Sequence, residues 1–438
     1  MEATLRAANI AFARRHPGDS EQRQPIHSVY GGAQLFRSDS AIKLGRVALR
    51  MLERYAPDPA TLARVLGLDD ARLAELVHER VAEKLRREAV EDYRIDFEDG
   101  YGNRPDAEED GHARSTAVEV ARGLEAGTLP PYIGIRVKPL NEELRERSIR
   151  TLELFVGTLV AETGGRLPTG FRLTVPKITI PEQSAYFAAV LERLERRQGL
   201  PAGSLVFEVM VETPQIVLDL PRVLEAARGR MVAAHFGTYD YTAACNITAA
   251  YQHMRHPACD FARHMLQVSF AGTGVWLSDG STTTLPVPPH RDPPAGKLAE
   301  HLERDNAAVV HLAWKLHFDD IQDSLMRGFY QGWDLHPAQL VTRYAANYAF
   351  FLRGLDAAGA RLRNFVERAA QATLVGAVFD DAATGQGLLN FFLRARSSGA
   401  VTDEEVLDRT GLTLGELRGR SFVGILRGHH HGDTEERH

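Results

Sequence analysis

Acidic residues end several short apolar segments of the sequence, where their side chains could meet in one active site. Glu212 comes at the end of the segment 204–213, and Asp240 ends the segment 231–240. Two ionised carboxylates that share a site repel each other unless a cation lies between them. Mg²⁺ commonly binds one or two protein carboxylates, with water and substrate oxygens as its other ligands. The pair therefore predicts a divalent-metal site, although either residue could instead cap a helix or meet an arginine.

Two basic residues occupy similar positions in neighbouring apolar segments. Arg136 lies within YIGIRVKP, where an unpaired guanidinium would be costly to bury. Its partner is either a substrate oxygen or the acidic cluster of Asp96, Glu98 and Asp99, and the sequence leaves both open. Lys177 could form a Schiff base, as lysines do in aldol chemistry. A metal pair would make that redundant, so we interpret Lys177 as a structural or electrostatic lysine.

The segments that carry these residues alternate with longer stretches of helical spacing. Eight apolar segments, rich in Val, Ile, Phe and Tyr, predict strands over residues 27–36, 93–99, 132–139, 172–179, 204–213, 231–240, 267–279 and 328–337. Helices are predicted over 59–90, 107–127, 141–164, 182–198, 216–228 and 296–325. Eight βα repeats without a glycine-rich first turn favour a (β/α)8 TIM barrel over a doubly wound sheet. In such a barrel the catalytic groups stand at the C-terminal ends of the strands.

The rest of the chain is organised around this barrel. The predicted parts are an N-terminal extension over 1–26, the barrel over 27–345, a helical C-terminal segment over 346–425 that could form a lid, and a polar tail over 426–438. Two long connections, 37–92 and 278–297, are either lids or specificity elements, or surface insertions without function.

Composition narrows the class of protein. The formal net charge of −6 gives no general attraction to nucleic acid or to an anionic membrane. With only two cysteines, neither a disulfide framework nor a cysteine-rich zinc site is available. The first 25 residues lack the apolar stretch of a signal peptide. We therefore expect a cytoplasmic protein whose partners are neither nucleic acids nor membranes.

Six motifs occur in an order that is characteristic of a known family. They are DFEDG (96–100), GIRVKPL (134–140), VPKIT (175–179), VETPQIVLD (211–219), FGTYDYTA (236–243) and GWDLHPAQL (332–340). In this order the chain resembles the HpcH/HpaI aldolase/citrate lyase superfamily, and within it the citrate lyase β-subunit-like branch that includes malyl-CoA lyases.

The resemblance implies a role for each matching residue. Glu212 and Asp240 would ligate Mg²⁺, or Mn²⁺ in its place. Arg136 would contact the carbonyl or enolate oxygen of the substrate. Glu98 and Asp99 would hydrogen-bond metal-bound water or orient Arg136.

Further residues follow from the same resemblance. Lys177, Gly237 and Thr238 would line the substrate site. The segment GAVFDDAATGQGLL is similar to one that carries a catalytic aspartate in malyl-CoA lyase-like members, which makes Asp380 a general acid/base, with Asp381 or helix capping as the alternatives. That segment reaches a neighbouring subunit in such enzymes, which implies a homo-oligomer.

The implied function is a Mg²⁺-dependent carbon–carbon lyase or aldolase that works through a metal-stabilised enolate. Its substrate would be a small oxo or hydroxy acid or an acyl-CoA. The long insertion after HSVYGGAQLFRSDS replaces residues that help to bind coenzyme A in the thioester-using members, so the use of CoA is left open. The alternatives are a phosphotransferase acting on phosphoenolpyruvate or pyruvate, and a non-catalytic metabolite-binding barrel.

Overall fold

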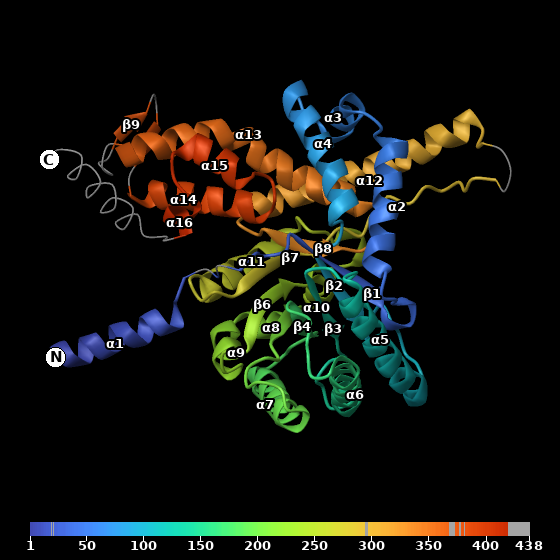
Figure 1. Cartoon of the computed structure of the whole chain (residues 1–438), viewed down its shortest axis with the longest axis vertical. Helices are drawn as coiled ribbons and strands as arrows, with labels where there is room; N and C mark the ends of the chain where they lie inside the picture. The colour runs from blue at the N-terminus through green and yellow to red at the C-terminus, as the bar shows by residue number, and fades with distance from the viewer. Residues whose placement is uncertain are drawn as a thin grey trace. The chain divides into compact units, whose positions relative to one another are not determined.

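Eight parallel strands form a closed barrel, in which each strand pairs with the next and β8 pairs with β1 (Figure 1). The strands are β1 (His27–Gly32), β2 (Asp92–Asp96), β3 (Tyr132–Arg136), β4 (Phe171–Val175), β5 (Phe207–Val211), β6 (Met231–Phe236), β7 (Trp276–Ser281) and β8 (Gln331–Asp334). This computed structural model describes residues 1–18, 20, 22–293, 297–367, 373–375, 378–380 and 382–418, with the backbone alone for residues 367, 373–375, 378–380, 382, 383 and 418. The predicted (β/α)8 fold is confirmed.

Helices occur in the connections between the strands (Figure 1). They are α2 (Ser40–Tyr55), α3 (Pro59–Leu66), α4 (Ala71–Arg87), α5 (Asp106–Ala126), α6 (Arg145–Thr163), α7 (Pro181–Gln198), α8 (Pro214–Val217), α9 (Leu220–Ala226), α10 (Thr238–Ala244), α11 (Pro257–Phe270) and α12 (Glu300–Met326). Helices α5, α6 and α7 each end at a glycine with a left-handed backbone, at Gly127, Gly164 and Gly199. Such a glycine satisfies the last carbonyls of a helix without steric cost. None of the described helices is long and apolar enough to cross a bilayer.

Two sequence predictions were wrong in detail. The helix expected over 59–90 is two helices, because the left-handed Gly67 ends α3. The strand expected over 267–279 begins only at Trp276, since residues 267–270 form the last turn of α11. Gly272 and Gly274 then take positive φ angles and turn the chain towards β7.

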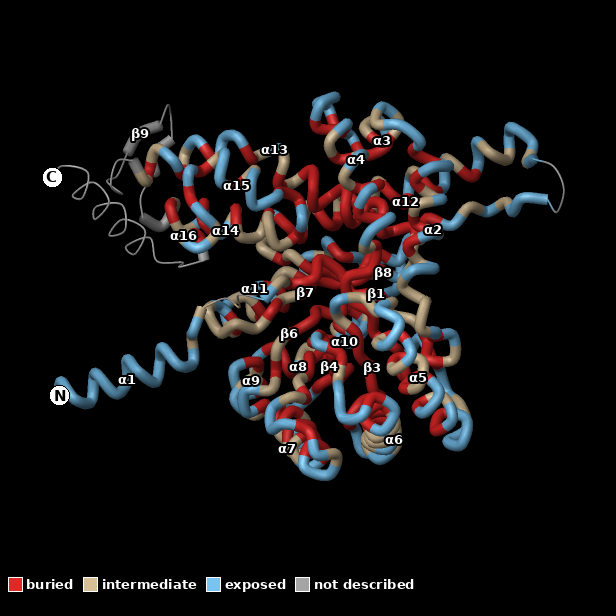
Figure 2. The backbone as a smooth tube through the Cα atoms, viewed as in Figure 1, coloured by how far each residue is buried: buried red, intermediate tan, exposed pale blue. Residues whose placement is uncertain are grey.

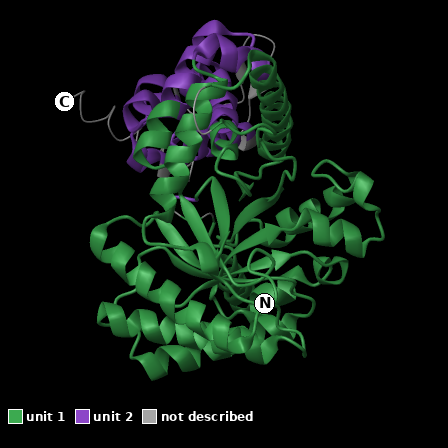
Figure 3. Cartoon of the chain, turned by 90° about the vertical axis from the view of Figure 1, so that its right-hand side faces the viewer, with its two compact units in different colours: residues 1–20, 25–57, 82–343 green, residues 21–24, 58–81, 344–438 purple. Residues whose placement is uncertain are grey.

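The chain divides into two compact units (Figure 3). The first comprises residues 1–20, 25–57 and 82–343 and contains the barrel. The second comprises 21–24, 58–81 and the described residues of 344–438. It contains α3, most of α4, most of α13 (Gln339–Glu367), and α14 (Ala382–Ser397), α15 (Asp403–Thr410) and α16 (Leu414–Arg418). The predicted boundary at residue 345 stays a prediction.

Charged side chains fill the middle of the barrel, where the strands are buried (Figure 2). Arg94 on β2 donates to Thr174 Oγ1 at 3.0 Å and to Glu208 Oε2 at 2.8 Å, and it also contacts Asp92. His235 Nε2 lies 3.0 Å from the same Glu208 oxygen. Buried charges are tolerated when they are paired in this way. The barrel interior is therefore a packed polar core beneath the strand ends.

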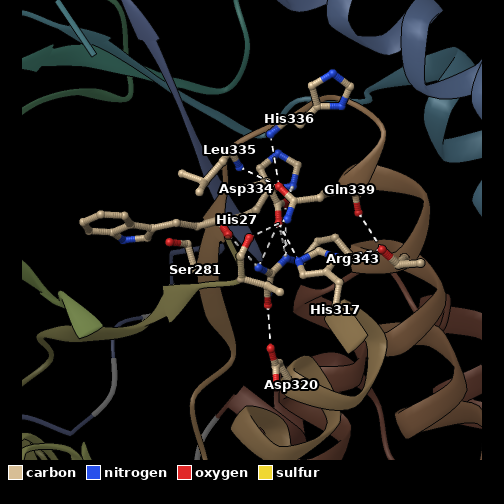
Figure 4. Close-up of polar contacts among 12 residues, drawn as sticks. His27, Ser281, His317, Asp320, Asp334, Leu335, His336, Gln339 and Arg343 are labelled. Atoms are coloured by element: carbon tan, nitrogen blue, oxygen red, sulfur yellow. Dashed lines mark hydrogen bonds and ion pairs between the residues drawn. The ribbon is translucent and has the colours of Figure 1, made fainter. Parts of the chain in front are cut away.

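A second buried cluster lies where β8 meets β1, centred on Asp334 (Figure 4). Arg343 Nη2 donates to Asp334 Oδ1 at 2.9 Å, His317 Nε2 lies 3.1 Å from that oxygen, and His27 Nδ1 lies 3.4 Å from Oδ2. Burial lowers the pKa of His27 from 6.5 to about 4, although Asp334 and Glu91 oppose the shift. The other charges facing His27 are those of Arg343 and Lys84, which favour its neutral form. His27 is therefore a neutral imidazole in the folded protein.

We expect this neutral imidazole to make stability depend on pH. The unfolded chain takes up a proton near pH 6.5 and the folded protein only near pH 4, so the unfolded state binds more protons in between. The free energy of unfolding should therefore fall by about 3 kcal/mol from this group as the pH drops from 7 to 4. Urea titrations should show that His27→Asn loses this part of the slope, whereas His264→Asn, at an exposed site, keeps it. Equal slopes in wild type and His27→Asn would contradict the assignment.

Candidate active site

The C-terminal ends of β2 to β6 bring the predicted site residues together at one mouth of the barrel. These are Glu98 and Asp99 after β2, Arg136 at the end of β3, Lys177 after β4, Glu212 after β5, and Gly237, Thr238 and Asp240 after β6. Parallel strands of a barrel all end on the same side, which is why residues so distant in sequence converge.

Asp96 holds the guanidinium of Arg136 in a fixed orientation. The two residues are neighbours in the β2–β3 register, and Nε and Nη2 of Arg136 donate to the two carboxylate oxygens at 2.7 and 2.5 Å. The same oxygens accept the backbone N–H groups of Glu98 (2.9 Å) and Gly100 (2.7 Å). A Cβ at residue 100 would lie 2.6 Å from Asp96 Oδ2, so the loop requires glycine there. The sequence had named Asp96 only as one of three acidic residues that Arg136 could meet.

Arg136 keeps part of its hydrogen-bonding capacity. Of the five N–H groups of a guanidinium, Asp96 accepts two, and Nη1 lies 3.1 Å from Glu98 Oε2. Two N–H groups remain, one of which faces Met210 Sδ at 3.8 Å. The ring of Tyr30 lies 4.8 Å from the guanidinium carbon. The ion-pair alternative left open by the sequence is thus realised, with donor capacity left for a further oxygen.

Lys177 links the acidic residues of the mouth. Its Nζ donates to Glu98 at 2.5 Å and Asp99 at 2.8 Å, and it lies 3.7 Å from Asp240 Oδ2. Burial would lower the pKa of Lys177, but Asp99 and Glu98 outweigh it and raise the pKa above its usual value. A Schiff base requires the neutral amine, so these contacts favour the electrostatic interpretation of the lysine.

The backbone N–H of Lys177 also forms a hydrogen bond with Glu212. Lys177 has a φ of +48°, a left-handed conformation that costs energy for a residue other than glycine. In that conformation its N–H donates to Glu212 Oε2 at 2.8 Å. Local strain here thus fixes one oxygen of the Glu212 carboxylate.

Glu212 and Asp240 line one cavity of about 240 Å³, together with Lys177. Glu212 is 2% exposed, and burial raises its pKa to about 8, with Asp240 adding to the rise and Arg136 and Lys177 opposing it. The rise in pKa reflects mainly the cost of burying the charged carboxylate, and a bound cation would stabilise that charged form. Among the described residues no three His, Cys, Asp or Glu side chains are arranged to hold a metal. Two carboxylates with open positions for water and substrate fit Mg²⁺.

Gly237 and Thr238 support these residues from β6 and α10. A Cβ at residue 237 would lie 2.3 Å from Glu212 Cγ, so glycine makes room for that side chain. Thr238 is buried, and its Oγ1 contacts Met254 Sδ at 3.3 Å. Both residues therefore shape the mouth, and their predicted contact with substrate stays a prediction.

The predicted acid/base residue lies in the second unit. The backbone of Asp380 belongs to β10 (Val378–Asp380), which pairs antiparallel with β9 (Thr373–Val375). Its side chain and the whole of Asp381 lie outside the described residues. The role of Asp380 stays a prediction.

Several solved structures are similar to this chain. A citrate lyase of Burkholderia xenovorans LB400 is 17% identical, with 87% of this chain and 95% of that chain covered and a TM-score of 0.57. A malate synthase of Haloferax volcanii is 16% identical, with 90% and 98% covered and a TM-score of 0.49. The β subunit of citrate lyase from M. tuberculosis, solved with oxaloacetate and magnesium, is 14% identical, with 74% and 96% covered and a TM-score of 0.39. The likeness to the Burkholderia protein confirms the fold that the motif order implied.

A family model also matches the chain. Residues 5–425 match the model of a domain of unknown function, DUF6986, and the chain is a member of that family. No curated protein matches the chain.

Proposed function

We propose that this chain is a divalent-metal-dependent carbon–carbon lyase or aldolase that acts on a small oxo or hydroxy acid. The observation that carries the proposal is the convergence of Glu212 and Asp240 on one cavity beside the carboxylate-held Arg136. Glu212 and Asp240 would hold Mg²⁺ or Mn²⁺. When bound, the ion would supply Lewis-acid stabilisation of negative charge that develops on a substrate oxygen. The order of the six motifs supports the same chemistry.

The remaining residues would orient the substrate and stabilise charge. Asp96 fixes the plane of Arg136, whose remaining N–H groups can donate to a substrate oxygen. Such donors accelerate the reaction when they bind the charged transition state more strongly than the ground state. Lys177 keeps Glu98 and Asp99 together at the rim of the mouth. Asp380 remains the candidate for proton transfer, acting in a homo-oligomer, on the strength of the resemblance.

Metal removal tests the proposal directly. Protein treated with EDTA should lose the Mg²⁺-dependent cleavage or formation of a carbon–carbon bond in oxo and hydroxy acids, and Mg²⁺ or Mn²⁺ should restore it. Isothermal titration of the metal-free protein with Mg²⁺ should show one site per chain. Full activity in metal-free protein would overturn the proposal, as would phosphate transfer from phosphoenolpyruvate or ATP as the only activity.

A further inference from the structure

Near Glu212 and Asp240, the basic residues of the barrel mouth are each paired with a carboxylate. Between Arg136 at the end of β3 and the start of α10, the connections after β3, β4, β5 and β6 contain only two more, Lys138 and Lys177. Their nearest carboxylates are those of Asp96 for Arg136 at 2.5 Å, Glu109 for Lys138 at 3.1 Å and Glu98 for Lys177 at 2.5 Å. A second anionic group on a substrate would therefore find no uncommitted cation in these connections.

The balance of charge at the mouth is negative. When a bound cation keeps Glu212 ionised, Asp96, Glu98, Asp99, Glu212 and Asp240 contribute five negative charges against the two positive charges of Arg136 and Lys177, which leaves an excess of three before the cation is counted. A divalent metal ion reduces this excess to one. The carboxylate of an oxo acid can reach the metal, but a further negative charge would be repelled by the remaining acidic groups.

Apart from Lys177, Glu212 and Asp240, the cavity is lined only by uncharged residues, four polar and two apolar. Its other lining residues are Pro139, Asn141, Thr179, Gln183, Thr213 and Ala244. Its volume of about 240 Å³ is below the ~300–1,000 Å³ of pockets for drug-sized ligands. It therefore suits a fragment of a few heavy atoms.

Three of these side chains retain hydrogen-bonding capacity after their structural bonds. Asn141 Oδ1 accepts the N–H of Leu144 at 2.9 Å, which leaves its amide N–H groups. Gln183 Nε2 donates one N–H to Leu140 O at 3.3 Å and has a second. The hydroxyl of Thr213 donates to Ile178 O at 2.8 Å and can still accept. Donors and an acceptor around one small cavity match hydroxyl groups, which both donate and accept.

We propose that this cavity binds an uncharged, hydroxyl-bearing aldehyde fragment, so that the enzyme selects hydroxy-oxo acids with one carboxylate over dicarboxylates. The inference rests on the proposed function. In cleavage, the bond between the carbinol carbon and the carbon next to the oxo group breaks, and its electron pair forms the enolate of the oxo acid. The carbinol loses its hydroxyl proton and becomes the aldehyde, and a proton is returned to the enolate carbon, so the step needs no further reactant.

The aldehydes that the protein accepts with pyruvate and Mg²⁺ test this selection. We expect kcat/KM for glycolaldehyde and glyceraldehyde to exceed that for the anionic glyoxylate, and that for the hydroxyl-free propanal, by at least about tenfold. Asn141→Asp keeps the oxygen that accepts from Leu144 but exchanges the amide donor for a charge. It should lower kcat/KM for the hydroxyaldehydes at least about tenfold. Glu142→Gln, at a neighbouring side chain that is 89% exposed, should keep the wild-type preference.

A second measurement separates this inference from the proposed function. Exchange of the pyruvate methyl protons with D₂O reports Mg²⁺-dependent enolisation without any aldehyde. Absence of exchange would overturn the proposed function itself. Exchange combined with equal or faster use of glyoxylate or propanal, or with no use of any hydroxyaldehyde, would overturn the selection alone.

Discussion

Glu212→Gln should abolish Mg²⁺ binding at the barrel mouth and lower turnover by about 10²–10³-fold. Glutamine has the same length, and its amide oxygen can still accept the N–H of Lys177, which donates to Glu212 Oε2 at 2.8 Å in the wild type. The change therefore removes a charge and leaves the shape of the site intact. Asp240, whose side chain is 45% exposed, would be the only remaining ligand, and water competes strongly for such a group.

Thermal unfolding with and without Mg²⁺ measures this effect apart from activity. A ligand that binds only the folded state raises Tm by an amount that grows with the ratio of its free concentration to its Kd. Wild type should therefore gain stability on addition of Mg²⁺, and Glu212→Gln should not. Metal-free Glu212→Gln should be at least as stable as wild type, because a neutral amide costs less to bury than a carboxylate. Glu225→Gln, at an exposed site on α9, serves as the control and should keep the rise in Tm on addition of Mg²⁺. Wild-type Mg²⁺ affinity and turnover in Glu212→Gln would show that Glu212 is not a metal ligand.

The barrel could be predicted from sequence because its strands are short, apolar and regularly spaced. The same regularity placed Glu212 and Asp240 at strand ends. Glu212 does follow β5 directly, whereas β6 ends at Phe236 and Asp240 lies in the first turn of α10. The lengths of the strands were overestimated: β2 stops at Asp96, although the apolar Phe97 continues the apolar pattern of the predicted strand 93–99. It stops because the Asp96 side chain accepts the N–H groups of residues 98 and 100, which turns the chain.

Contacts across the barrel could not be predicted in the same way. Whether Arg136 meets a substrate or an acidic cluster depends on the register of β2 against β3, which no local pattern specifies. The left-handed backbone of Lys177 likewise gives no signal in sequence, since lysine has no preference for it. The segment 267–270 has apolar residues compatible with strand or helix, and its place at the end of α11 decides between them.

The pairing of Asp96 with Arg136 raises the question of whether the arginine is structural or also contacts substrate. Arg136→Gln should destabilise the protein by about 3–5 kcal/mol, because it leaves Asp96 buried without a cation and Glu98 paired with Lys177 alone. Asp96→Asn should destabilise it for the converse reason. The double variant removes both charges. Its loss of stability, measured by urea unfolding, should be smaller than the sum of the two single losses by about 1–3 kcal/mol.

The activities of the single and double variants distinguish a structural role of Arg136 from a role in substrate binding, because the double variant can recover stability without recovering catalysis. If Arg136 were only structural, the double variant would regain turnover together with stability. If it donates to a substrate oxygen, as we propose, the double variant should recover stability while kcat/KM stays about 10²-fold or more below wild type. Arg230 provides the matched control, since it binds Glu195 through two contacts of 2.7 and 2.8 Å at the start of β6, the opposite end of the barrel. Arg230→Gln should lower stability and leave kcat/KM unchanged. A loss of kcat/KM that occurs only in the Arg136 variants would then result from the position of Arg136 at the barrel mouth.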